Sequence, residues 1–260
     1  MEAQSYYNAL QIRIEKRASH YISIVGGYTL SKSTDDSSVG RNAFIGSLAS
    51  DNPQQLDNLK AEHSISANDA THRLALAVIA DLPIGRGRWI GSGMNPVLDG
   101  VVGGWTVSTI LTEQSGQPID IGISQPTLDD GNQRPNITCN PGSNVSAHQS
   151  ALSQSSANPL STFNSNCFSF PNYEQPGNAP RYFSSLRTDG IHNIDIAFEK
   201  AFIPHEGMRL EVRGEFFNFF NTPRFAPPDT LFGDSTFGQI TSTAMGSTPR
   251  HGQMGVRFEF

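Results

Sequence analysis

Residues 250–260 read Arg-His-Gly-Gln-Met-Gly-Val-Arg-Phe-Glu-Phe, and this stretch decides the fold class. From residue 253 onward, apolar and polar side chains alternate without a break. One face of the segment carries Met254, Val256, Phe258 and Phe260, and the other carries Gln253, Gly255, Arg257 and Glu259. A period of two predicts a β-strand with one apolar and one polar face. A strand that is apolar outside and charged inside is typical of a transmembrane β-barrel.

The composition of the 260 residues agrees with such a barrel. Hydrophobic residues make up 37% and charged residues 16%, both low values for a globular protein, and only one face of a barrel strand is apolar. The net charge is −6, and no basic patch indicates a nucleic-acid partner. No run reaches the roughly 18 apolar residues of a transmembrane helix. No signal peptide precedes the first predicted strand, so we expect the natural N-terminus to be missing.

Seven segments alternate with a period of two, and each has about the 9–11 residues that a tilted strand needs to cross a bilayer. They are residues 6–16, 20–31, 71–82, 101–115, 191–200, 208–219 and the terminal strand from 253. In the fourth, which alternates less regularly, we expect Trp105, Val107, Thr109 and Leu111 to face lipid. The sixth carries a row of alternating charges, which are Arg209, Glu211, Arg213 and Glu215. In a barrel, this row is predicted to line a wet lumen, where opposite charges pair.

The connections between the predicted strands alternate in length. Residues 32–70, 116–190 and 220–249 are long, and the other three connections are shorter. Outer-membrane barrels have short periplasmic turns and long extracellular loops. Counting back from a periplasmic C-terminus places every long connection outside the cell, where loops carry ligand contacts. Because seven strands leave unpaired edges and bacterial barrels have an even strand number, we expect residues 1–260 to be the C-terminal part of a larger barrel.

The two cysteines, Cys139 and Cys167, lie in polar sequence rich in Pro, Asn and Ser. An even count in such surroundings predicts a disulfide bond and an oxidising compartment. The alternative is two free thiols.

Several motifs resemble the barrel of Oar-like TonB-dependent receptors, which carry a carboxypeptidase-regulatory-like N-terminal domain. The motifs are Tyr7-Asn8-Ala9-Leu10-Gln11-Ile12-Arg13, Gly27-Tyr28-Thr29-Leu30-Ser31-Lys32-Ser33 followed by Asp35-Asp36, Asp81-Leu82-Pro83-Ile84-Gly85, Gly103-Gly104-Trp105, Gln114-Ser115-Gly116-Gln117-Pro118, Glu215-Phe216-Phe217-Asn218-Phe219-Phe220-Asn221 with Pro223 and Phe225, Phe237-Gly238-Gln239-Ile240 and the terminal strand. They follow in order along nearly the whole chain.

The resemblance implies a 22-stranded barrel with a plug, energised through TonB. This sequence contains no plug, TonB-binding segment or regulatory-like domain, so a link to the TonB system is expected only through missing N-terminal parts. Met254, Val256, Phe258 and Phe260 resemble the C-terminal signal that the barrel-assembly machinery reads. The other partners implied are outer-membrane lipid and an unknown ligand at the extracellular loops. Aromatic residues near strand ends are expected to form interfacial girdles; they are Tyr6, Tyr7, Tyr21, Tyr28, Trp105, Phe219, Phe220, Phe258 and Phe260.

Other motifs indicate turns rather than chemistry. The runs Asp35-Asp36 and Asp129-Asp130-Gly131-Asn132 consist of common turn residues, and the second lacks the later glutamate of a calcium loop. The run Gly85-Arg86-Gly87-Arg88-Trp89 lacks the Lys-Ser/Thr of a phosphate loop. The seven histidines show no metal-binding spacing. We therefore expect no enzyme activity, no cofactor and no metal.

The sequence leaves three functions open. The first is a fragment of an outer-membrane TonB-dependent receptor that binds and takes up an unknown ligand. The second is a surface binding or adhesion protein whose barrel only anchors its loops. The third is a soluble all-β enzyme or lectin, which predicts that the apolar strand faces pack against each other beneath a hydrophilic exterior.

Overall fold

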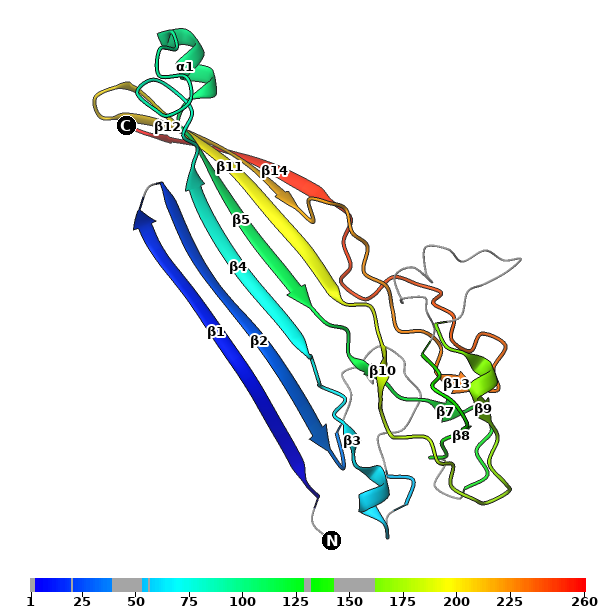
Figure 1. Ribbon diagram of the computed structural model, residues 1–260. Coiled ribbons are helices and arrows are strands. Elements are labelled where there is room, and N and C mark those ends of the chain that lie inside the picture. The colour runs from blue at the N-terminus through cyan, green and yellow to red at the C-terminus, as the bar shows by residue number, and fades with distance from the viewer. Residues whose placement is uncertain (1–2, 20, 39–52, 56, 129–131, 143–161) are drawn as a thin grey trace.

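The computed structural model describes residues 3–19, 21–38, 53–55, 57–128, 132–142 and 162–260. Its main body is one antiparallel sheet of long strands (Figure 1). Across the sheet, these strands are β1 (Ser5–Ser19), β2 (Ile22–Asp35), β4 (His72–Asp81), β5 (Trp105–Gln114), β11 (Ile191–His205), β12 (Met208–Phe217) and β14 (His251–Glu259). Each pairs with its neighbours in antiparallel register, so the sheet is a meander.

All seven predicted strands are present in the predicted order, which confirms the predicted antiparallel all-β fold. Several boundaries differ. Strands β1, β2 and β11 run past their predicted C-terminal ends, and the fourth predicted strand starts too early, because Val101 and Val102 end helix α1 (Pro96–Val102) instead of starting a strand. A proline at the start of the helix and a side-chain cap from Asn95 to the N–H of Leu98 favour helix over strand here. At the sixth strand, β12 ends at Phe217 rather than at residue 219.

The register brings most of the apolar residues of the seven strands onto one face, which we call the apolar face, although Val25, Ile79 and Ile110 lie on the other. Residues directly opposite each other in an antiparallel pair point to the same side of the sheet. One such row runs Ile12, Tyr28, Leu74, Glu113 and His192, and a second runs Lys16, Ile24, Val78, Thr109, Ile196 and Phe216. The side chains of Trp105, Val107, Thr109 and Leu111 share this face, as the sequence predicted.

The opposite side of the sheet, which we call the polar face, carries the charged rows. Arg209, Glu211, Arg213 and Glu215 lie on it, opposite Glu259, Arg257, Gly255 and Gln253 of β14. Tyr7 also lies on this face, paired with Ser33 in the same alternation as Gln11. The expectation that Tyr7 belongs to an aromatic girdle on the apolar side is therefore wrong.

The three long connections gather beyond one end of the sheet and form what we call the loop assembly: the described parts of residues 36–71, 115–190 and 218–250 (Figure 1). It contains the short pairs β2 with β3 (Ser64–Ile65), β6 (Pro118–Ile119) with β10 (Phe183–Arg187), β7 (Gly122–Ile123) with β13 (Leu231–Phe232), and β8 (Asn136–Ile137) with β9 (Phe168–Ser169). Short 3-10 helices, η2 (Leu59–Glu62) and η3 (Ser165–Cys167), complete it. The long loops thus have secondary structure of their own.

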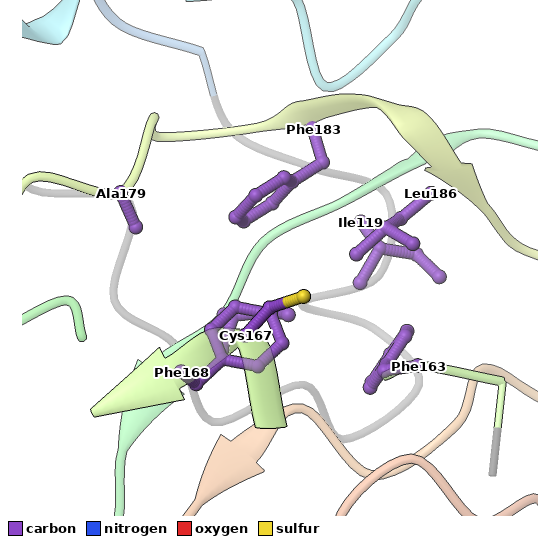
Figure 2. Packing of buried hydrophobic residues seen from close by; sticks show 8 residues of the cluster. Ile119, Phe163, Cys167, Phe168, Ala179, Phe183 and Leu186 are labelled. Atoms are coloured by element: carbon purple, nitrogen blue, oxygen red, sulfur yellow. The ribbon is translucent and has the colours of Figure 1, made fainter. Parts of the chain in front are cut away.

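The hydrophobic core of the described residues lies in the loop assembly and not in the sheet. Figure 2 shows its main cluster, in which Phe163, Phe168 and Phe183 pack around Ile119 and Cys167. The phenyl rings of Phe168 and Phe183 pack edge to face, with their centres 6.1 Å apart. Large apolar side chains of the sheet, by contrast, are exposed, among them Leu10, Ile12, Ile14, Met254 and Val256. No segment of the described part of the chain therefore covers the apolar face, in contrast to the packed sheets that the soluble alternative requires.

The remaining connection of interest, residues 82–104 between β4 and β5, lies at the other end of the sheet from the loop assembly (Figure 1). It contains α1 and a tight turn held by hydrogen bonds from the N–H of Gly85 to the carbonyl of Ile90 and from the N–H of Ile90 to the carbonyl of Pro83. We call it the turn module.

Candidate functional site

The loop assembly is the candidate functional site because it joins distant parts of the chain into one packed surface beside the polar face. Cys139 and Cys167 form a disulfide bond, with Cα atoms 5.0 Å apart. Cys167 is fully buried among the aromatic residues of the core cluster. The bond therefore ties the end of β8 to the start of β9 at the centre of the assembly.

A buried ion pair joins the first long connection to the second. Arg134 donates from Nη1 to Oε2 of Glu62 over 2.6 Å and from Nη2 to Oε1 over 3.0 Å, a two-pronged geometry. Glu62 has no solvent exposure, and its Oε1 also accepts the backbone N–H groups of Gln54 and Gln55. Charge-assisted hydrogen bonds of this kind are the strong ones, and they compensate the burial of both charges.

Two further arginines of the second connection fasten the end of β2 and the start of β4. Arg181 binds the side chain and carbonyl of Asp35 through Nη2 and donates from Nη1 to Oγ of Ser38 over 2.9 Å. Arg187 donates from Nη2 to Oδ2 of Asp69 over 2.8 Å, and Oδ1 of Asp69 accepts the N–H of Ser33 at the same distance. Each arginine thus connects a loop to the rim of the sheet.

Asp36 forms a separate pair with His63. Its Oδ1 lies 2.6 Å from Nδ1 of His63, and its Oδ2 accepts the N–H of Gln4 over 2.9 Å. Burial raises the pKa of Asp36, but the hydrogen bonds from His63 and Gln4, together with the charges of His63 and Arg181, outweigh it and hold the pKa below its ordinary value. Asp35 and Asp36 are therefore anchors of the assembly, which the interpretation as a simple turn missed. Asp129, Asp130 and Gly131 lie outside the described residues.

A hollow of about 250 Å³ opens on the polar face where β1, β2 and β4 meet the loop assembly. Its wall includes Tyr7, Gln11, Thr29, Asp69 and Arg73. Hydroxyl, amide and guanidinium groups beside an exposed phenol ring can hydrogen-bond and stack against a polar ligand. The sequence placed ligand contacts in the long loops but did not identify this hollow, because its residues come from three strands and a loop.

The predicted charged row lies farther along the polar face. Within β12, Arg209 lies 3.2 Å from Glu211 and Arg213 lies 2.6 Å from Glu215, and β14 adds the pair Arg257 and Glu259 at 2.6 Å. The cations and carboxylates thus pair along each strand.

Met254, Val256 and Phe258 of β14 lie on the apolar face and are exposed, and the side chain of Phe260, beyond β14, is almost fully exposed.

Among the described residues, no cluster of three or more His, Cys, Asp or Glu side chains has the arrangement of a metal site. In the same part of the chain, no helix is long and apolar enough to cross a membrane.

A family model described as an outer membrane beta barrel domain matches residues 1–253. Neither a curated protein nor a solved structure matches the chain.

Proposed function

The chain belongs to the family of outer membrane beta barrel domains, and from this premise we propose that it is the C-terminal part of a TonB-dependent receptor. In this proposal, the loop assembly captures a ligand outside the cell and delivers it to the lumen for uptake. In the same proposal, the apolar face of the sheet contacts outer-membrane lipid; its family and its exposed apolar residues support this. The polar face lines the lumen.

The observation that carries the proposal is the rigid construction of the loop assembly next to the polar hollow. A disulfide bond and three Arg–carboxylate pairs fix loops that come from distant parts of the chain. Loops held in one conformation lose less entropy when a ligand binds, so such a surface is suited to specific capture. The hollow lies on the lumen side of the sheet, where a captured ligand would enter.

The two outer strands of the sheet support the idea of a larger barrel. In the described sheet, β1 and β14 each pair on one side only. Unpaired backbone groups in lipid are strongly unfavourable, so we propose that further strands complete the barrel. Contact with TonB would then depend on those further parts of the receptor.

The alternative function is surface binding or adhesion, with the barrel as an anchor. It is favoured by the separate hydrophobic core of the loop assembly, which does not depend on a lumen. Both functions require ligand binding at the loops, and only the receptor requires energised passage through the barrel.

Uptake experiments on energised cells separate the two. Cells that carry the complete gene would be offered fluorescent ferric siderophores, oligosaccharides and peptides, with and without an uncoupler of the proton-motive force. The receptor predicts that one class binds and enters, and that the uncoupler stops entry but not binding. Binding without entry in energised cells would support adhesion. Retention no greater than that on cells lacking the gene would contradict both functions.

A further inference from the structure

The turn module exposes more apolar surface than a turn in water normally does. Trp89 is 88% exposed and Val97 is 80% exposed, and Ile90, Leu98 and Val101 are each at least half exposed. None of the residues of α1 is buried. A contiguous group of this kind marks a surface that contacts a membrane or another molecule.

Two side chains of the apolar face hold the C-terminal end of α1. The indole Nε1 of Trp105 donates to the carbonyl of Val101 over 2.9 Å. The ammonium group of Lys200 donates to the carbonyl of Gly103 and lies 3.5 Å from that of Asp99. Trp105 and Lys200 are paired in register on the apolar face. The end of α1 is therefore attached to the lipid-facing side of the sheet.

This attachment suits an environment without water. The last carbonyl groups of a helix have no partner within the helix, and in water the solvent hydrates them. At a bilayer, protein donors must satisfy them instead. Lys200 is only 4% exposed, and its ammonium group also lies near the rings of Trp105 and Phe202. A lysine buried against helix carbonyls on a lipid-facing surface fulfils this requirement.

Cationic groups lie beside these apolar residues. The guanidinium of Arg88 lies 4.6 Å from the centre of the ring of Tyr21, at the turn between β1 and β2. Its Nη1 is buried and has no hydrogen-bond partner among the described residues. Arg86 is two residues away and exposed. Arginine presents a planar set of donors that matches the oxygens of a phosphate group.

We propose that the turn module is a membrane-docking element that inserts into the periplasmic leaflet of the outer membrane. Trp89, Val97, Leu98 and Val101 enter the boundary between headgroups and acyl chains, and the exposed Arg86 binds phospholipid phosphate. The partner is a phospholipid because the exposed group continues the apolar face, which the family places in contact with lipid. The inference does not depend on any ligand of the loop assembly.

The test uses a fluorophore attached at Val97. Because Cys139 and Cys167 are bonded to each other, a Val97→Cys variant of the full chain has one free thiol. A Glu206→Cys variant is the matched control, since Glu206 lies in the polar turn between β11 and β12 at the same end of the sheet. Both labelled chains are mixed with vesicles of phosphatidylethanolamine and phosphatidylglycerol.

Quenching by headgroup-level nitroxide lipid and by aqueous iodide then reports the position of each label. The proposal predicts lipid quenching and loss of iodide quenching at position 97, with the opposite result at position 206. Equal iodide quenching at both positions, or no change when vesicles are added, overturns it. An Arg86→Gln variant should lose lipid quenching at position 97 in anionic vesicles. Unchanged quenching overturns the role of Arg86. Added inorganic phosphate should not reduce the lipid quenching at position 97.

Discussion

At the scale of single residues, the buried ion pairs of the loop assembly differ from the exposed pairs of the strands. Glu62 and Arg134 are enclosed, share two hydrogen bonds and each bind a further backbone group, whereas Arg257 and Glu259 are open to solvent. The loss of one partner of a buried pair leaves an uncompensated charge, but exposed pairs contribute little.

Replacement of the buried carboxylate should therefore loosen the loops. We expect Glu62→Gln to destabilise the loop assembly by about 3–5 kcal/mol, because Arg134 keeps a buried charge without its counterion. Hydrogen exchange of the amides in residues 132–142 and 176–187 would measure the effect. Glu259→Gln, in an exposed pair, is the control and should change stability by less than about 1 kcal/mol. If the loop amides exchange hydrogen equally fast in the Glu62→Gln and Glu259→Gln variants, the buried pair does not have this structural role.

The pair of Asp36 and His63 makes the loop assembly sensitive to acid. The pKa of Asp36 is lower in the folded protein than its ordinary value of 3.8. The ionised carboxylate therefore stabilises the fold above pH 3.8, and this contribution disappears as the pH falls through the lowered folded pKa. A His63→Ala variant should raise the pKa of Asp36 and reduce the contribution. Titration of the Asp36 carboxyl carbon by NMR measures the pKa of Asp36 in the wild-type chain and in the variant. Identical titration curves for the two proteins would show that the pair with His63 does not lower this pKa.

At the scale of elements, the sequence predicted the strands well and the loops poorly, for a physical reason. A strand in lipid carries its signal locally, because each residue alternates between two environments. The contacts of the loop assembly join residues far apart in the chain, such as Arg181 and Asp35, which no local pattern reveals. Helix α1 was missed although Asn95 and Pro96 provide a start signal, since seven residues are too few for a helical period to stand out.

Two adjacent positions of β4 test the assignment of the faces. Val78 lies on the apolar face and Ala77 on the polar face. We expect Val78→Arg to destabilise the vesicle-folded protein by up to about 2–4 kcal/mol, because a charge on the lipid-facing side of a barrel is unfavourable and the cost is greatest near the bilayer midplane. Ala77→Arg should have a much smaller effect, since its side chain enters the lumen. Urea titrations followed by tryptophan fluorescence would compare the two, and a larger loss for Ala77→Arg would reverse the assignment.

At the scale of the whole molecule, the chain combines an open sheet that needs lipid with a loop assembly that has its own core. The sheet exposes its apolar face, whereas the loop assembly buries a cluster of its apolar residues, so the two parts respond to different changes.

Removal of the disulfide bond should destabilise the loop assembly and leave the sheet folded. A Cys139→Ser/Cys167→Ser variant should lose about 2–4 kcal/mol of stability in the loop assembly, because the unfolded loops gain conformational freedom. Protease cleavage within residues 132–185 should accelerate, while the strands remain protected in vesicles. Faster cleavage within β4 or β12 would show instead that the sheet depends on the loops.

The central claim is that the loop assembly lies outside the cell and the turns lie in the periplasm. The most direct test is labelling of intact cells with a membrane-impermeant maleimide. Ser235→Cys places a thiol in the loop assembly, and Glu206→Cys places one in the turn between β11 and β12. The account predicts that position 235 is labelled on intact cells and position 206 only after lysis. Labelling of position 206 on intact cells, with position 235 protected, would contradict it.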